Sequence, residues 1–293
     1  MIEVKSLTKV YPSGKGIFDV SFDVKEGEIF GFLGPNGAGK TTTIRNLMGF
    51  TNPTKGHASI GGLDCRTQAA KIQEKLGYVP GEIAFFDNMT GLQFLKFIAD
   101  MRGVHDSSRQ KKLIEWFELE SNRKIRKMSK GMKQKVGLIA AFMHDPNVIV
   151  LDEPTSGLDP LMQRKFVELI IEERNRGKTI LMSSHMFDEV DKTCERVAII
   201  RDGRIVAVED IKTLKASLEK SFFITFANSS EIEKIEKSGL DFKIAGEHKV
   251  EIIVTGDYSP LINTLSNCHV TDIATSVQTL EHIFMRYYSK EAK

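Results

Sequence analysis

The sequence contains little cysteine and no long apolar run, and both absences narrow the class of protein. The chain of 293 residues has three cysteines, which are odd in number, far apart and without metal-ligand spacing: Cys65, Cys194 and Cys268. This pattern predicts a reduced, cytosolic chain rather than a disulfide-stabilised secreted one. No uncharged apolar run approaches the roughly 20 residues that a membrane span requires, and Met1–Lys5 shows no apolar signal segment. We therefore expect any work at a membrane to depend on a partner.

An excess of charge of one sign is also lacking. Lys and Arg number 41 against 39 Asp and Glu, which leaves a net charge of +2. This balance gives no case for a nucleic-acid binder that depends on bulk electrostatics. The basic stretch Arg123–Lys127 is most simply a solvated loop, with nucleic-acid binding as the less favoured alternative. Hydrophobic content of 41% and charged content of 27% are ordinary for a globular protein, and the length suggests two domains.

A glycine-rich motif near the N-terminus carries the first recognisable chemistry. It has the pattern Gly, four residues, then Gly-Lys-Thr, between an apolar strand over 28–33 and a helix that opens at Thr43. Glycines let the backbone wrap closely around a triphosphate, and the positive end of the following helix attracts the same anion. We expect Lys40 to reach the β- and γ-phosphates and the Thr41 hydroxyl to ligate Mg²⁺. The residues predicted to bind ATP here are Gly34, Asn36, Gly37, Gly39, Lys40, Thr41 and Thr42.

Two acidic residues follow a second apolar strand, Val148–Leu151. Asp152, at the carboxyl end of that strand, is placed to hold Mg²⁺ through water beside the phosphate loop. Glu153 is placed to orient and deprotonate an attacking water. Taken alone, two acidic residues after a strand are more often a solvated loop, but a phosphate loop upstream reverses that preference. An apolar run of this kind suits a strand that is covered on both faces in a parallel sheet.

Hydrophobic periodicity divides the first part of the chain. Alternating apolar residues over 1–27 predict antiparallel strands, and helical spacing over about 87–143 predicts an all-helical insert between two halves of an α/β core. Asp202-Gly203 is a strong hairpin signal into the last strand of that core. The N-caps expected in the insert are Thr90, in a capping box with Gln93, then Ser107 or Ser108, and Ser129.

The pattern changes after about residue 211. A charged helical linker over 214–220 precedes a run of predicted strands and helices. The strands are expected at 222–226, 241–245, 249–254 and 269–275, and the helices at 230–237, 259–266 and 279–288. The order β-α-β-β-α-β, with one helix added, is typical of a ferredoxin-like α+β domain. We therefore expect a first domain over 1–215 and an accessory or regulatory domain over 221–293.

Residues 1–215 resemble the nucleotide-binding subunit of an ABC transporter. Glu153–Pro160 is similar to the family's Walker B motif and D-loop taken together. Ser129–Gln134 lies where the family carries its signature Ser-Gly-Gly-Gln, at the start of a helix. The resemblance implies a P-loop core with a mixed sheet, an antiparallel β subdomain and a helical insert. It further implies ATP hydrolysis coupled to transmembrane transport.

Two aromatic side chains, one on each side of the phosphate loop in the sequence, extend this resemblance. His185, after Ser183-Ser184, matches the switch histidine, which would hold the γ-phosphate and link it to Glu153. Tyr11 matches the residue that stacks on adenine. Without these motifs, a satisfied core histidine and a surface turn tyrosine would be the favoured interpretations.

The family arrangement implies that the ATP site is shared between two chains. Two cassettes pair head to tail, as a homodimer or with a second, different cassette, and each phosphate loop faces the other chain's signature helix. Ser129 and Gly131 would then clamp a γ-phosphate held by the other chain, with Asp159 of the partner subunit linked to the histidine. An N-cap serine and the first N–H groups of a helix do form an anion site. The resemblance also implies an integral membrane permease as partner, a peripheral position on the cytoplasmic face of the membrane, and no nucleic acid.

Two departures from the family pattern stand out. Tyr78-Val-Pro80 continues into Gly81-Glu82, where the family has a glutamine that contacts Mg²⁺ or its water. Either Glu82 takes over as a metal ligand or the contact is lost. The signature also carries Lys130 and Met132 in place of the usual residues, which adds positive charge near a triphosphate. Both variants are similar to single-cassette subunits of bacterial exporters for drugs, antibiotics, peptides or sodium.

Two rival functions compete with transport as interpretations of the sequence. A soluble ABC-class ATPase acting on DNA or the ribosome is disfavoured, because no sustained heptads and no second cassette are present in the sequence. An inactive cassette is disfavoured because the chemistry-bearing residues Lys40, Thr41, Asp152, Glu153 and His185 are intact. The transported substrate is not encoded here, since in this family the cargo path lies in the membrane subunit.

Overall fold

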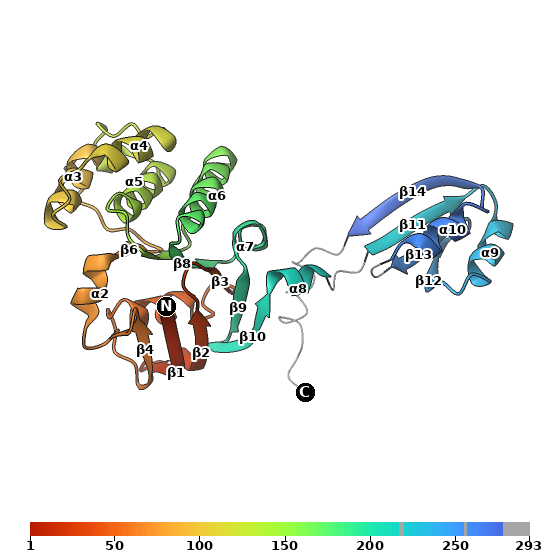
Figure 1. The fold of residues 1–293 in the computed structure, drawn as a ribbon, viewed down its shortest axis with the longest axis horizontal. Coiled ribbons are helices and arrows are strands. Elements are labelled where there is room, and N and C mark those ends of the chain that lie inside the picture. Colours follow the sequence, from red (N-terminus) through yellow and green to blue (C-terminus); the bar gives the residue numbers. More distant parts are fainter. Residues whose placement is uncertain (217–219, 255–256, 278–293) are drawn as a thin grey trace. The chain divides into compact units, whose positions relative to one another are not determined.

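The computed structural model describes residues 1–216, 220–254 and 257–277 (Figure 1). The chain forms two compact units, Met1–Glu209 and Asp210–Lys293. The helix predicted at 279–288 lies outside the described residues.

The first unit begins with a four-stranded antiparallel sheet in the order β2-β1-β4-β5. Its strands are β1 (Ile2–Val10), β2 (Gly16–Val24), β4 (Lys55–Ile60) and β5 (Leu63–Asp64). Val20, Phe22 and Val24 are buried on β2, and the residues between them are exposed, because every second side chain of a strand faces the same way. The antiparallel strands predicted over 1–27 are confirmed.

A six-stranded sheet forms the centre of this unit, in the order β10-β9-β3-β8-β7-β6. Its strands are β3 (Ile29–Leu33), β6 (Leu76–Val79), β7 (Val148–Asp152), β8 (Thr179–Ser184), β9 (Arg196–Arg201) and β10 (Arg204–Asp210). The neighbours from β9 through β6 pair in parallel. Every residue of β3, β7 and β8 is buried, as expected for strands covered on both faces. Asp202 and Gly203, both with positive φ, form the predicted hairpin turn between β9 and β10.

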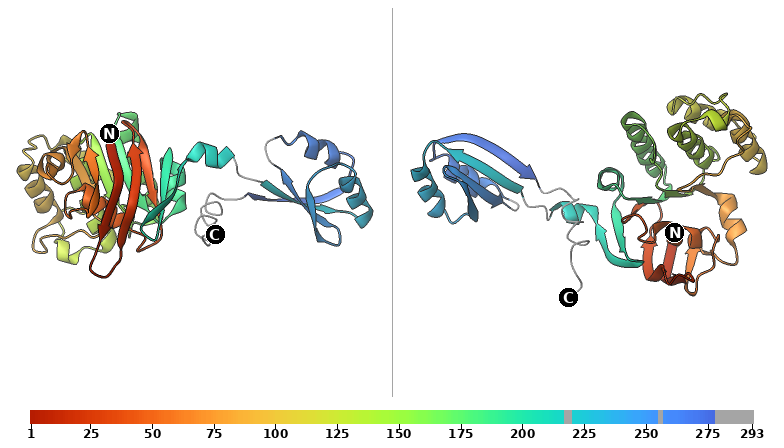
Figure 2. Two further views of the ribbon diagram at one scale, coloured as in Figure 1. Left: turned by 90° about the horizontal axis from the view of Figure 1, so that it is seen from below. Right: turned by 180° about the vertical axis from the view of Figure 1, so that it is seen from behind.

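Helices flank the central sheet and also form a group of their own. The helices that directly connect strands of this unit along the chain are α1 (Lys40–Leu47), α2 (Ala69–Lys75), α6 (Pro160–Asn175) and α7 (Phe187–Thr193). The helical insert contains α3 (Gly91–Met101), α4 (Ser108–Trp116), the 3₁₀ turn η1 (Ile125–Lys127) and α5 (Lys130–Phe142). Figures 1 and 2 show α3, α4 and α5 gathered at one end of the unit, away from β1, β2 and β4. The insert predicted over about 87–143 is confirmed as helical.

Two of the three predicted N-caps of the insert form as expected. Thr90 and Gln93 make both hydrogen bonds of the capping box at α3, and the Ser129 side chain caps α5. Ser107 occupies the N-cap position of α4, one of the two positions predicted, but its side chain accepts no capping hydrogen bond from a described residue. The Asp106 carboxylate accepts the Ser108 N–H instead, at 2.8 Å. A carboxylate is the stronger acceptor and lies one residue nearer the preceding loop.

Phenylalanines join the two sheets of the first unit. Phe22 of the antiparallel sheet stacks on Phe30 of β3 at 5.4 Å between ring centroids and lies 5.2 Å from Phe32. Both β3 rings are fully buried. Burial of each such side chain stabilises the fold by roughly 1.5–3 kcal/mol. These contacts hold β3 of the central sheet against the antiparallel sheet, and they therefore fix the position of the loop that follows β3.

The second unit contains a four-stranded antiparallel sheet in the order β12-β13-β11-β14. Its elements are α8 (Ile211–Ala216), β11 (Lys220–Phe226), η2 (Ser229–Glu231), α9 (Ile232–Glu236), β12 (Phe242–Gly246), β13 (Lys249–Val254), α10 (Ser259–Leu265) and β14 (Val270–Val277). Val250 and Ile252 of β13 pack in one cluster with Ile232 and Ile235 of α9 and Leu261 of α10. Both helices therefore cover the same face of the sheet, and the unit has a core of its own.

Candidate active site

The glycine-rich loop joins β3 to α1, and several of its positions can be occupied without strain only by glycine. Gly37 and Gly39 have φ of +82° and +113°, a region that disfavours side chains. A Cβ on Gly34 would lie 2.6 Å from the Ile200 carbonyl oxygen. The loop therefore packs closely on β9, and it places the N-terminus of α1 at the carboxyl ends of the parallel strands. No acidic residue lies in the first turn of α1, so its positive end faces the loop without a counter-charge from its own helix.

Lys40 is the first residue of α1 and is held inside the loop. Its side chain is only 5% exposed. The Nζ atom donates to the carbonyl oxygens of Gly34 at 2.6 Å and of Pro35 at 3.3 Å. It also forms an ion pair of 3.0 Å with Oε1 of Glu153. An ammonium that is already desolvated and oriented is a strong site for a further anion.

A pocket of about 240 Å³ opens at this loop and collects most of the predicted ATP-binding residues. It is lined by Tyr11, Lys15, Gly16, Pro35, Asn36, Gly37, Gly39, Lys40, Thr41, Thr42 and Glu153. Tyr11 and Lys15 come from the turn between β1 and β2, so the antiparallel sheet supplies one wall. Lys15 was not predicted; its place in the same turn as Tyr11 was the only signal in the sequence. The Thr41 side chain is exposed at the pocket.

Glu153 connects the lysine of the pocket to a histidine. Its Oε2 atom accepts from Nδ1 of His185 at 2.5 Å, while Oε1 pairs with Lys40. The backbone of Glu153 has φ of +51°, which a non-glycine residue rarely adopts. Its N–H donates to the carbonyl and hydroxyl oxygens of Ser183 on β8, which hold it in that conformation. The carboxylate is therefore placed between a cation on one side and an imidazole on the other.

Asp152 lies at the end of β7 with its whole side chain buried. Oδ1 accepts from the Ser183 hydroxyl at 2.5 Å, but Oδ2 has no hydrogen-bond partner among the described residues. A buried carboxylate oxygen without a partner costs on the order of 1–3 kcal/mol or more, which a cation at this point would offset. A Cβ on Gly81 would lie 3.2 Å from this oxygen. Gly81, rather than Glu82, is thus the neighbour of Asp152; Glu82 is exposed and forms no hydrogen bond or ion pair with any residue that the structure describes.

The signature segment and the residues after Glu153 form a second cluster, outside the lining of this pocket. Ser129 caps α5 by accepting the Met132 N–H at 3.2 Å. Lys130 donates from Nζ to the Ser156 hydroxyl at 2.8 Å, and a Cβ on Gly131 would lie 2.5 Å from the Gly157 carbonyl oxygen. Asp159 caps α6 in the same way as Ser129 caps α5, through the N–H of its third helical residue. Ser129 and Lys130 at the N-terminus of α5 are exposed, and neither is among the residues that line this chain's own pocket.

Known proteins identify the family. Residues 17–156 match the model of the family described as "ABC transporter". The chain is 36% identical over 211 residues to the bacitracin transport ATP-binding protein BcrA of Bacillus licheniformis, which covers 70% of this chain and 68% of that protein. The chain belongs to the ABC transporter ATP-binding proteins.

Two further similarities extend over the cassette. The chain is 29% identical over 308 aligned positions to the linearmycin resistance ATP-binding protein LnrL of Bacillus subtilis, with 97% of each chain covered. The dimeric structure of a post-hydrolysis state of the ATP-binding cassette MJ0796, bound to ADP and Pi, superposes with a TM-score of 0.66 at 25% identity and covers 72% of this chain and 99% of that chain. The protein is therefore an ABC cassette that binds and hydrolyses ATP, with a mixed α/β sheet and an antiparallel β subdomain. Among the described residues no helix is both long and apolar enough to cross a membrane.

Proposed function

We propose that this cassette powers the export of an antibiotic or drug-like compound through a separate integral membrane permease. The names of the two relatives, a linearmycin resistance protein and a bacitracin transport protein, support this direction and substrate class. The cassette would act as a peripheral subunit at the cytoplasmic face of the membrane. The observation that carries the proposal is the contact chain from Lys40 through Glu153, both in the pocket lining, to His185, because these three groups would provide phosphate binding and water activation together.

We propose the following role for each side chain during hydrolysis. Tyr11 stacks on the adenine, while Lys40 and the loop N–H groups bind the β- and γ-phosphates. Glu153 accepts a proton from water as its oxygen attacks the γ-phosphorus, and the bond to the β–γ bridging oxygen breaks to release ADP and phosphate. His185 donates a hydrogen bond to Glu153 and contacts the γ-phosphate, so that it senses whether the bond is intact. Pre-organised charge around a transferring phosphoryl group is the main source of rate enhancement in such sites.

The residues proposed to hold Mg²⁺ are Thr41, Asp152 and Glu82. The unpartnered buried Oδ2 of Asp152 fits a hard cation, which prefers oxygen ligands. The described residues contain no cluster of three or more His, Cys, Asp or Glu side chains, so the protein would share the ion with phosphate oxygens and water. Bound Mg²⁺ supplies positive charge that neutralises the phosphates. Glu82→Ala should weaken the Mg²⁺ dependence of hydrolysis while ATP affinity changes little; an unchanged Mg²⁺ titration would leave Glu82 a loop residue.

We propose that the complete site forms between two cassettes, either two copies of this chain or this chain and a second cassette. The pocket of about 240 Å³ is smaller than the roughly 300–1,000 Å³ of sites that enclose a whole ligand, so another surface is expected to close it. Ser129 and Gly131 at the start of α5, with Asp159, would supply that surface to the opposite chain. The solved cassette MJ0796 bound to ADP and Pi is itself dimeric.

Glu153→Gln tests the catalytic assignment. The amide is nearly isosteric but cannot take the proton of water, so turnover should fall by about a hundredfold or more while ATP binding persists. ATP should then trap the paired form, seen as a doubled mass in gel filtration, whereas the wild-type protein returns to its starting mass as ATP is consumed. Near-normal hydrolysis by Glu153→Gln would remove Glu153 as the base.

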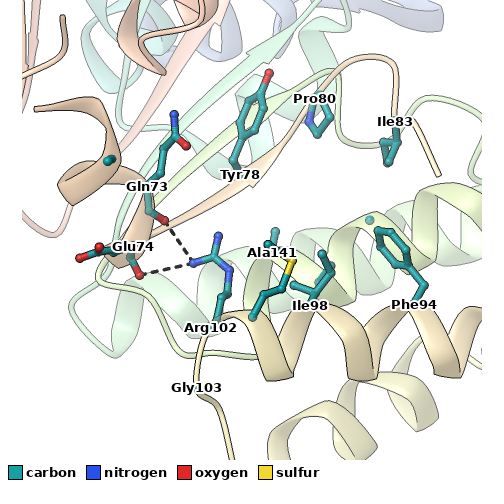
Figure 3. A pocket seen from close by; sticks show the side chains of 14 residues that line it. Gln73, Glu74, Tyr78, Pro80, Ile83, Phe94, Ile98, Arg102, Gly103 and Ala141 are labelled. Carbon is teal, nitrogen blue, oxygen red and sulfur yellow. Dashed lines mark hydrogen bonds between the residues drawn. The ribbon is translucent and has the colours of Figure 1, made fainter. Parts of the chain in front are cut away.

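A groove in the first unit is the surface that we propose for the permease. Its volume is about 900 Å³, and Figure 3 shows Tyr78 and Pro80 on one side of it and Phe94 and Ile98 of α3 on the other. The lining is mainly apolar, and Met101 at its margin is 71% exposed, as suits the apolar face of a permease helix. The residue after Pro80 is Gly81, which lies beside Asp152. A movement of the docked permease helix against Pro80 would therefore be transmitted to the ATP site. Ile98→Asp should abolish co-purification with the permease and leave the basal ATPase rate intact.

The second unit is proposed to be a ferredoxin-like accessory domain over about 221–293, following a cassette domain over 1–215. The support is its β-α-β-β-α-β order and an antiparallel sheet whose helices cover one face. Its role would be regulatory, because every residue proposed to contact ATP lies in the first unit.

A further inference from the structure

A buried carboxylate on α7 forms hydrogen bonds to the chain segments that carry Glu153 and His185. Glu189 lies in the first turn of α7 and is 6% exposed. Its Oε1 atom accepts from the Thr155 hydroxyl, and its Oε2 accepts from the Ser184 hydroxyl at 2.7 Å. Glu189 lies outside the phosphate loop, the segment Glu153–Pro160 and the signature segment Ser129–Gln134. Its two hydrogen-bond partners nevertheless lie close to the catalytic pair in the sequence, because Thr155 is two residues from Glu153 and Ser184 is next to His185.

On one side, Glu189 fixes the turn that carries the histidine. The Ser184 hydroxyl donates to Glu189, and its oxygen accepts the N–H of Met186 at 2.9 Å. His185 lies between these two residues. Because its own hydrogen is engaged by the carboxylate, the serine oxygen keeps a lone pair directed at Met186, and the backbone around His185 is closed into a short turn.

On the other side, Glu189 fixes the segment that carries the base. Thr155 follows Glu153 by two residues, and the carbonyl oxygen of the intervening Pro154 accepts from the buried Gln134 side chain at 2.7 Å. The φ of +51° at Glu153 is a strained conformation that persists only where its neighbours hold it. The Thr155 hydroxyl and the Gln134 amide are two such anchors.

We propose that Glu189 is a positioning residue that sets the distance between Glu153 and His185 by binding both of their chain segments. A carboxylate suits the task because it accepts from two hydroxyl groups at once and has no hydrogen of its own to misdirect them. Burial raises the pKa of the Glu189 carboxyl, and the two hydroxyl donors oppose that rise. The inference rests on the roles proposed above for Glu153 and His185.

The test measures ATP hydrolysis by the full chain, with kcat, KM and the dissociation constant for ATP determined separately. Glu189→Ala should lower kcat by about ten- to a hundredfold, the usual cost of misplacing a reacting group by an ångström, with KM and ATP affinity within about twofold. Glu189→Gln, whose amide must reverse one of the two hydroxyl hydrogen bonds, should lower kcat by about threefold or more. Asp188→Asn, on the exposed side of the same turn, is the matched control and should leave kcat unchanged.

A second set of variants separates positioning from general destabilisation. Thr155→Val removes only the hydroxyl and should reproduce the fall in kcat, whereas Thr155→Ser retains the hydroxyl and should restore it. In the double variant Thr155→Val, Glu189→Gln the losses should not add, because both remove the same contact. These near-isosteric variants decide the question even if Glu189→Ala does not fold.

Glu153→Gln serves as the reference in the same assay. If it retains turnover, the proposed function of the pocket fails. If it loses turnover while Glu189→Gln and Thr155→Val keep the wild-type kcat, the catalytic assignment stands and the positioning role of Glu189 is overturned.

Discussion

Two helix N-termini in the first unit, those of α1 and α5, carry the groups that we propose to bind phosphate, and their surroundings differ. The N-terminus of α1 is capped by a glycine, carries a lysine that is 5% exposed, and faces a pocket of its own chain. The N-terminus of α5 is capped by the Ser129 side chain, carries an exposed Lys130, and has no share in that pocket. Both present free backbone N–H groups and the positive end of a helix.

From this difference we infer that one cassette divides ATP binding between the two helix ends. At α1 the Lys40 ammonium is desolvated and oriented in advance, so we expect ATP to bind there without a partner and most of the affinity to arise there. At α5 the serine already satisfies one N–H of its helix, and the lysine is held by Ser156. That end is expected to contribute when a triphosphate from the opposite chain reaches it, which affects turnover more than affinity. Three variants of the chain test this division.

The largest effect is expected from Lys40→Ala at the α1 end. It removes a buried ammonium that pairs with phosphate, so ATP affinity should fall by about a hundredfold, or roughly 3 kcal/mol, together with turnover. Lys192→Ala, an exposed lysine on α7, is the control and should bind ATP normally. The measurement is titration calorimetry with ATP and Mg²⁺. Retention of wild-type affinity by Lys40→Ala would contradict the assignment of α1 as the main source of binding.

A smaller and different effect is expected from Ser129→Ala at the α5 end. Turnover should fall by about tenfold, while the ATP affinity of the single chain stays within about twofold. Loss of an N-cap also destabilises the helix by roughly 1 kcal/mol. Thr90→Ala removes the equivalent cap from α3 at a similar cost and is therefore the matched control, with near-normal turnover expected. Equal losses of turnover in the two variants would mean that Ser129 only stabilises its helix.

The smallest effect is expected from removal of the second unit, which contributes to neither N-terminus. A chain of residues 1–215 should remain folded and bind ATP with an affinity within about twofold of the full chain, because the second unit has its own core. Its rate of turnover is expected to change by more than its affinity if the unit regulates pairing. Circular dichroism and the same ATP titration check this, and unfolding or loss of binding on truncation contradicts the two-domain proposal.

The α1 end was predictable from the sequence, whereas much of the α5 end was not. The phosphate loop needs glycines at fixed offsets from a lysine, so local sequence specifies it, and the same holds for the caps Thr90 and Ser129. Helix α2 was not predicted because it buries only Ile72 and so lacks an apolar stripe. The Lys130–Ser156 and Glu189–Thr155 hydrogen bonds join residues 26 and 34 positions apart. Such pairings depend on how strands and helices pack, and no local pattern encodes them.

The ion pair between Lys40 and Glu153 has a consequence for how ATP enters. The Glu153 carboxylate pairs with the same Lys40 ammonium that a phosphate would bind. It therefore competes with ATP for Lys40, at the high effective concentration of a group in the same chain. We therefore expect the binding of ATP to exchange one anion for another at Lys40, so that its free energy is the difference between two interactions. In this proposal a phosphate displaces Glu153 from Lys40, and the carboxylate becomes able to accept a proton from water only when ATP is bound.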